Sequence, residues 1–163
     1  FIICALFSYL TGIAVASPEK SQVMELLEGR HWILDAEVFQ RLGEGTDSVL
    51  IEIAEDKSLI NYLRFRALEA LSLFPTENAA TFLETTAKIK FAPLARRGFE
   101  ALKRGYAKTQ PERVKQLANH LLKHNNAQVR ISAARVIRSM DAPRFNLFLK
   151  SEQDAWVRKA SQK

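Results

Sequence analysis

Two histidines four residues apart form the pattern closest to a metal site in this sequence. His120 and His124 fall on successive turns of an expected helix, a spacing at which two imidazoles can share one ion. Structural and catalytic zinc sites take three or four protein ligands. No glutamate lies between the two histidines, and the single cysteine, Cys4, is remote in the chain. We therefore predict no metal site.

Other patterns that could support catalysis are weak. Gly43-Glu44-Gly45 contains the glycines of a phosphate-binding loop, but no strand precedes it, so we interpret it as a turn after a helix. Glu55 and Asp56 adjoin at an expected helix end, where both carboxylates would be solvated. No nucleophile elbow or dinucleotide-binding turn occurs. The sequence therefore predicts a protein that is not an enzyme and that uses no cofactor.

Basic side chains are the strongest functional signal. Residues 1–61 carry four Lys/Arg and ten Asp/Glu, a net charge of −6, whereas residues 62–163 carry twenty and eight, a net charge of +12. This asymmetry suggests that the basic part faces an acidic partner, although a solvated surface or an acidic neighbour would also explain it. The candidate partner-binding residues are Arg113, Gln116, Asn119, Lys123, Arg144 and Lys150.

A phrase that recurs along the chain predicts the elements that position these side chains. Its copies begin at Leu63, Leu94, Val129 and Val157, at intervals of 31, 35 and 28 residues. Repeats of this length are typical of stacked helix pairs. The apolar spacing predicts helices that carry the phrase at 31–42, 58–74, 93–104, 127–140 and from 154 onward. Connecting helices are predicted at 47–55, 76–88, 111–124 and 143–150.

Two positions of the phrase have expected structural roles. Ala67 and Ala133 are small where the next helix must approach closely, so a large residue there would overpack the stack. Arg64, Arg130 and Arg158 occupy the second position. We expect these arginines to hydrogen-bond carbonyls between repeats or to pair with an acid on a neighbouring repeat.

Glycines mark several expected helix ends. Gly43, Gly45 and Gly105 are each predicted just beyond a helix that carries the phrase, where a left-handed turn needs a residue without a Cβ atom. The earliest copy of the phrase, at 34–42, keeps the apolar positions but has Asp35 where Arg is expected. The copy at 94–102 has Ala95 at that position.

The phrase apolar-Arg-x-x-Ala-Ala-x-x-apolar resembles a HEAT repeat of the kind common in bacterial proteins, most closely at 129–137 and then at 63–71. The resemblance covers about residues 31–163 and implies an all-α fold, a right-handed alpha-alpha superhelix (an armadillo-like solenoid) of about four helix pairs. It also implies that the connecting helices line a concave face that binds another macromolecule. Another protein is the expected partner; an acidic polymer or nucleic acid, as for HEAT-like DNA glycosylases, is the alternative.

The chain begins with sixteen uncharged residues that end in Ala14-Val15-Ala16. An apolar stretch followed by small residues is typical of a secretory signal peptide, here without its start, and predicts export to the cell envelope or periplasm. A retained anchor is an alternative, although sixteen residues are short for a span of roughly 20, and so is a buried first helix. After cleavage no membrane span would remain. Residues 17–30 are expected to cap the repeats, which we expect to be incomplete at the C-terminus.

Overall fold

The computed structural model describes residues 17–163, and the predicted signal peptide at 1–16 lies outside this described part. The all-α prediction is confirmed for residues 17–163, which form helices and no strand. The helices are α1 (Lys20–Leu27), α2 (Ala36–Gln40), α3 (Thr46–Glu55), α4 (Asn61–Leu71), α5 (Glu77–Ala87), α6 (Ala92–Tyr106), α7 (Pro111–Leu121), α8 (Ala127–Met140), α9 (Ala142–Ser151) and α10 (Ala155–Ser161).

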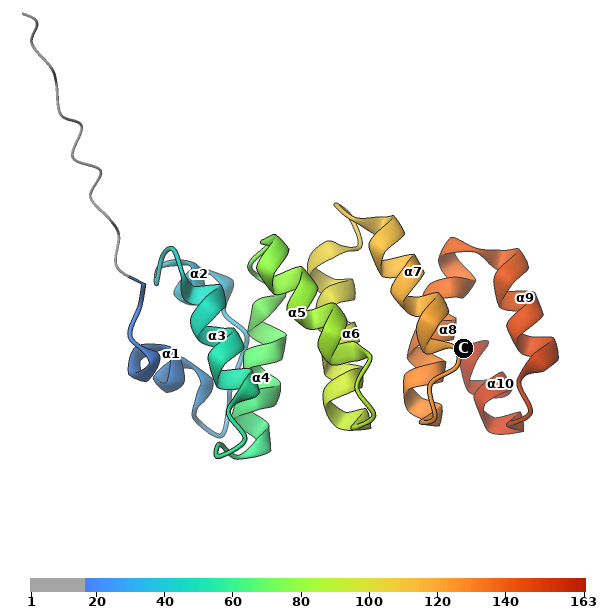
Figure 1. Ribbon diagram of the computed structural model, residues 1–163, viewed down its shortest axis with the longest axis horizontal. Coiled ribbons are helices and arrows are strands. Elements are labelled where there is room, and N and C mark those ends of the chain that lie inside the picture. The colour runs from blue at the N-terminus through green and yellow to red at the C-terminus, as the bar shows by residue number, and fades with distance from the viewer. Residues whose placement is uncertain (1–16) are drawn as a thin grey trace, which may run out of the picture.

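The helices lie side by side along one axis in two layers (Figure 1). Helices α4, α6, α8 and α10 contact one another in turn and form what we call the back layer. Helices α3, α5, α7 and α9 form the front layer, which faces the viewer in Figure 1. Each of α3, α5 and α7 packs against the helix that follows it in the chain, so the core lies between the two layers.

The helix predicted at 31–42 is helical only from Ala36 to Gln40, so its first five residues were predicted wrongly. The cause is Asp35, which stands at the position where three other copies carry Arg. Its carboxylate accepts hydrogen bonds from the amides of Glu37, at 3.0 Å, and Val38, at 3.2 Å, and so starts the helix after itself. Helix α1, which lies within the predicted cap segment 17–30, packs against α3 and α4.

Small residues set how closely the helices approach. Ala67 and Ala133 are fully buried at the small position of their copies of the phrase. Gly98 holds that position in α6, where a Cβ atom would lie 3.0 Å from the carbonyl oxygen of Leu83 in α5. The prediction for Gly105 was wrong, because α6 continues to Tyr106. Gly105 is needed for a different reason: a Cβ atom there would lie 2.6 Å from the Ser72 carbonyl oxygen.

Arg66 fastens α1 to the rest of the stack. Its guanidinium donates hydrogen bonds to the carbonyls of Leu27, at 2.5 Å, and Gly29, at 2.9 Å, at the end of α1. The same guanidinium lies 5.2 Å from the ring centroid of Trp32 and 4.8 Å from that of Tyr62. Cation–π contacts of this kind add to the hydrogen bonds and hold the side chain in place.

Tyr106, at the end of α6, ties the back layer to the turn between α4 and α5. The ring is fully buried, and the hydroxyl lies 2.7 Å from the Phe74 carbonyl oxygen and 3.0 Å from that of Thr76. Burial, which opposes the charged phenolate, raises the pKa of Tyr106 to about 12. The phenol therefore remains a neutral donor over most of the alkaline range.

Replacement of this tyrosine gives a pH-dependent prediction. The unfolded chain ionises Tyr106 near its ordinary pKa of 10, whereas the folded chain keeps it neutral to about 12. The stabilisation is therefore complete below pH 10 and is lost as the pH rises towards 12. We expect the free energy of unfolding of the wild type to fall more steeply over this interval than that of Tyr106→Phe.

Urea denaturation of both proteins at pH 8, 10 and 11 measures this difference. At pH 8 the variant should be less stable by about 1 kcal/mol, because the two carbonyls lose their donor. Parallel decreases in the two proteins between pH 8 and 11 would show that the tyrosine hydroxyl does not couple to folding.

Candidate ligand-binding surface on the front layer

The arginines at the second position of the phrase bond the end of the preceding front-layer helix. Arg64 donates from Nε to the carbonyl of Ala54 at 3.0 Å, near the end of α3. Arg158 donates to the carbonyl of Glu152, the residue that caps α9. Carbonyls at helix ends have no partner within the helix, and a charged donor satisfies them strongly. These two side chains therefore connect each turn to the back layer.

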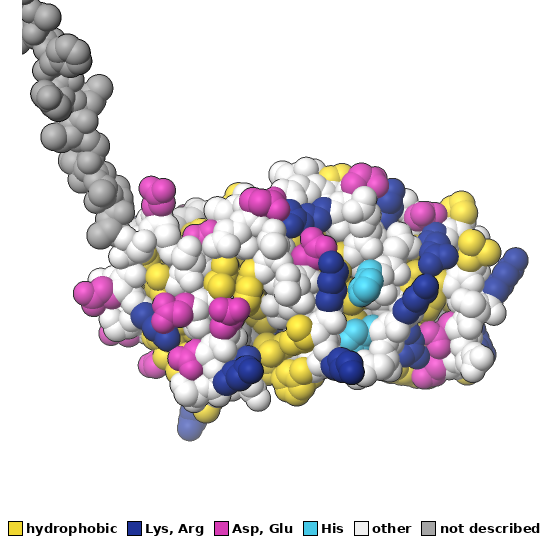
Figure 2. All heavy atoms as spheres, in the orientation of Figure 1, with side chains coloured by type: hydrophobic (Ala, Val, Ile, Leu, Met, Phe, Trp, Pro, Cys, Tyr) yellow, Lys and Arg dark blue, Asp and Glu magenta, His cyan; other side chains and the backbone are white. Residues whose placement is uncertain are grey.

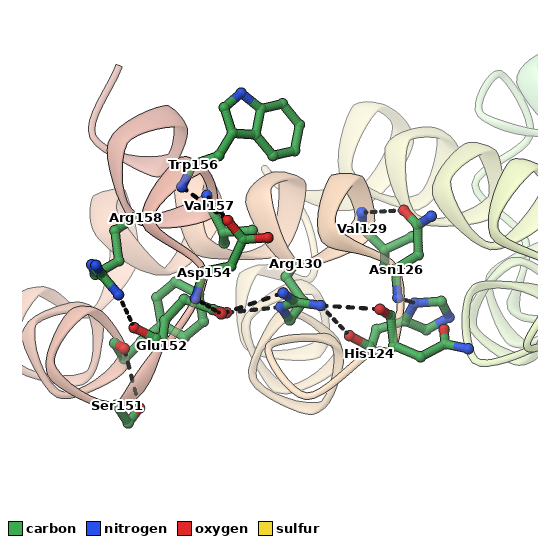
Figure 3. A network of polar contacts seen from close by, with 12 residues as sticks. His124, Asn126, Val129, Arg130, Ser151, Glu152, Asp154, Trp156, Val157 and Arg158 are labelled. Atoms are coloured by element: carbon green, nitrogen blue, oxygen red, sulfur yellow. Dashed lines mark hydrogen bonds and ion pairs between the residues drawn. The ribbon is translucent and has the colours of Figure 1, made fainter.

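Arg130 does the same for α7 and also forms the best buried ion pair (Figure 3). It donates to the carbonyls of His124, at 3.0 Å, and Asn125, at 3.1 Å, and its Nε lies 2.8 Å from the Glu152 carboxylate. The two side chains are only 16% and 9% exposed. Burial alone would raise the pKa of Glu152, but hydrogen bonds from Arg130 and the Asp154 amide outweigh it and hold that pKa below its ordinary value.

His124 replaces the missing arginine of the copy at 94–102 as a hydrogen-bond partner. With Ala95 at the second position of the phrase, the carbonyl of Ile89 after α5 is met by His124 Nε2 at 3.1 Å. The other ring nitrogen accepts from the Asn126 amide at 3.0 Å, which assigns the proton to Nε2. Both nitrogens of His124 are thus occupied, and His120 is exposed on α7. Across residues 17–163, no three His, Cys, Asp or Glu side chains gather closely enough to hold a metal ion.

Arg113, expected to bind a partner, instead forms ion pairs within the protein. Its guanidinium bridges α7 to α5, with Nη1 at 2.8 Å from both carboxylate oxygens of Glu77 and Nε at 3.2 Å from Glu84. The side chain is 20% exposed, and its charge is compensated by two acids. Gln116, one turn further along α7, is exposed.

Three of the expected binding residues do come together. Asn119, Lys123 and Arg144 line one hollow of about 580 Å³, together with Lys90 from the turn after α5. We call this site the cationic hollow; its lining is completed by His120, Leu121, His124 and Asn125. Figure 2 shows basic and histidine side chains gathered over α7 and α9 on this face.

The cations of this hollow are not compensated. Its lining contains no aspartate or glutamate, and Arg144 donates instead to the side-chain carbonyl of Asn119 at 3.2 Å. Lys90, Lys123 and Arg144 take part in none of the ion pairs formed within residues 17–163. Lys123 and Arg144 also border a neighbouring hollow of about 560 Å³ between α7 and α9, whereas Lys150 is exposed on α9 outside both.

Sequence reasoning missed a second feature of the front layer. An apolar groove of about 500 Å³ lies between α3 and α5, with part of its lining from α4 and α6. We call it the apolar groove; its main apolar residues are Ile51, Leu68, Phe82, Ile89 and Leu94. Partly exposed apolar residues on the front helices, such as Ile51 and Phe82, are the one signal that could have indicated it.

No protein-family model, curated protein or solved structure matches this chain. Among the helices of residues 17–163, none is long and apolar enough to cross a membrane.

The pair formed by Arg130 and Glu152 supports a mutational prediction. Arg130→Ala leaves a mostly buried carboxylate without its counter-ion and should lower the free energy of unfolding by about 3 kcal/mol. The double variant Arg130→Ala/Glu152→Gln should lose less than the sum of the two single variants, by about 1 kcal/mol or more. A double-mutant cycle by urea denaturation at pH 7 measures this coupling. Additive losses would mean that the pair does not stabilise the fold.

Proposed function

We propose that residues 31–163 form a HEAT-like, right-handed α-solenoid that acts as a non-enzymatic binding module. The recurring phrase and the two layers of neighbouring helices support this proposal. In such a solenoid the front layer would be the concave, ligand-facing side. The apolar residues 1–16 support export to the cell envelope as part of the same proposal.

The cationic hollow is the observation that carries the proposed binding function. Charges that are already paired within the protein gain little from a ligand, but Lys90, Lys123 and Arg144 have no acidic partner in the described part of the chain. Cations held together in a recess attract an acidic partner and favour its correct orientation. We infer that the partner is an acidic protein. Phosphates would also suit these cations, which keeps nucleic acid as the alternative.

Removal of the three charges tests this function. Fluorescence anisotropy with labelled poly-glutamate as the probe should show binding to the wild type that weakens as salt is added. Lys90→Gln/Lys123→Gln/Arg144→Gln should weaken binding at least tenfold. The matched control Arg96→Gln/Lys108→Gln/Lys159→Gln removes the same charge from exposed residues outside the hollow and should bind as the wild type does.

The control separates a site from a general charge effect. Equal losses in the two triple variants would show that net charge, rather than the hollow, attracts the probe. Tighter binding to duplex DNA than to poly-glutamate, with affinity that falls steeply with salt, would favour the nucleic-acid alternative.

Export is tested separately by the N-terminus of the mature protein. The chain is expressed in a Gram-negative host with its native upstream residues and a C-terminal tag, and the recovered protein is sequenced from its N-terminus. We expect a mature start at Ser17, because small residues precede it at 14–16. Recovery with residues 1–16 still attached would contradict export by a cleaved signal.

A further inference from the structure

The cationic hollow and the apolar groove are neighbours that share one short segment of chain. Ile89 lines the apolar groove, and the next residue, Lys90, lines the cationic hollow. His124 fixes this boundary, because its Nε2 lies 3.1 Å from the Ile89 carbonyl oxygen. Figure 2 shows hydrophobic side chains at the centre of the front face, beside the basic and histidine side chains. A ligand that occupies one site at this segment therefore lies next to the other site.

The two sites differ in charge. At the rim of the apolar groove, Glu55 and Lys57 have opposite charges, and Arg64 donates to the Ala54 carbonyl. The charged residues of the groove therefore sum to +1, against +3 for Lys90, Lys123 and Arg144 in the cationic hollow. Apolar surface is stabilised when it leaves water, so the groove favours an uncharged hydrophobic group.

The polar residues around both sites favour a polypeptide over a simple amphiphile. Exposed Asn78 and Thr85 lie along the groove, and Asn119 and Asn125 lie in the hollow. Amide and hydroxyl side chains can donate to carbonyls and accept from amides, so they can satisfy the backbone of an extended peptide. A hydrocarbon chain would form no hydrogen bond with these groups.

We propose that the front layer recognises a peptide segment in which acidic residues adjoin large apolar residues. The carboxylates occupy the cationic hollow beside Lys90, Lys123 and Arg144, and one or two apolar side chains enter the groove beside Ile51 and Phe82. This inference rests on the proposed binding function and specifies the partner's sequence character.

Four labelled peptides of twelve residues test this arrangement. Two contain six acidic residues joined to six that are rich in Leu and Phe, one in each order; the other two have Ser in place of Leu and Phe. Anisotropy titrations with the wild type should show that at least one acidic–apolar peptide binds about tenfold more tightly than its Ser counterpart, because burial of apolar side chains adds to the charge attraction.

Variants of the groove should remove this advantage. Thr85→Trp fills the groove from an exposed position on α5, and Phe82→Ser removes part of its apolar wall. Both should bind the acidic–apolar and Ser peptides within about twofold of each other, while their affinity for the Ser peptides stays that of the wild type. Thr109→Trp, in the exposed turn after α6, is the control and should keep the full advantage.

The outcomes distinguish this inference from the function on which it rests. Equal wild-type affinity for acidic–apolar and Ser peptides would overturn the inference while the acidic partner stands. Binding of neither kind would overturn both. Decanoate that displaces the acidic–apolar peptide from the wild type, but not from Thr85→Trp, would assign the site to a small amphiphile and overturn the peptide proposal.

Discussion

The carbonyls at the end of each front-layer helix and in the turn after it are the constraint on which the stack depends. These groups have no partner within the helix itself. Arg64, Arg130 and Arg158 are each the fourth residue of a back-layer helix. Each donates to a carbonyl at the end of the front-layer helix before it or in the turn that follows that helix. One residue type at one helical position therefore satisfies a backbone requirement and also connects the turn to the back layer. The arginine therefore recurs about once per helix pair, because every pair contains such an end.

The copy of the phrase at 94–102, one of two without this arginine, shows how strong the constraint is. Ala95 is the fourth residue of α6 and has no donor in its side chain, so the carbonyl of Ile89 is met from the following repeat by His124. The substitution changes the connection: an arginine would join α6 to α5, whereas His124 joins the end of α7 to the end of α5. His124 thereby comes to lie at the boundary between the apolar groove and the cationic hollow. The residue that compensates for Ala95, His124, therefore also separates the two surface sites.

Local patterns in the sequence were sufficient for most of the helices and for the small positions at Ala67 and Ala133, because helical periodicity and close packing depend on residues a few positions apart. They failed where a side chain acts over a longer distance. The apolar spacing predicted a helix from residue 31, but α2 starts after Asp35, because the Asp35 carboxylate accepts from the first amides of the helix. The pairs that occupy Arg113 lie 29 and 36 residues away in the chain, and only the register of α5 against α7 brings them together. The apolar groove escaped prediction for the same reason, since four helices line it.

Neighbouring helices contact one another differently in the two layers, and this difference produces the hollows on the front layer. In the back layer small residues allow backbones to approach, as Gly105 does against Ser72. In the front layer long polar side chains connect the later helices, as Arg144 does from α9 to Asn119 of α7. Helices joined by side chains leave hollows between them, and a cation at the edge of a hollow finds an acid only where the neighbouring helix supplies one. In the hollow between α7 and α9 the acid is Glu152, which pairs with Arg130, so Lys123 forms no ion pair within the described chain. The same construction that spaces the front helices therefore leaves positive charge available to a partner.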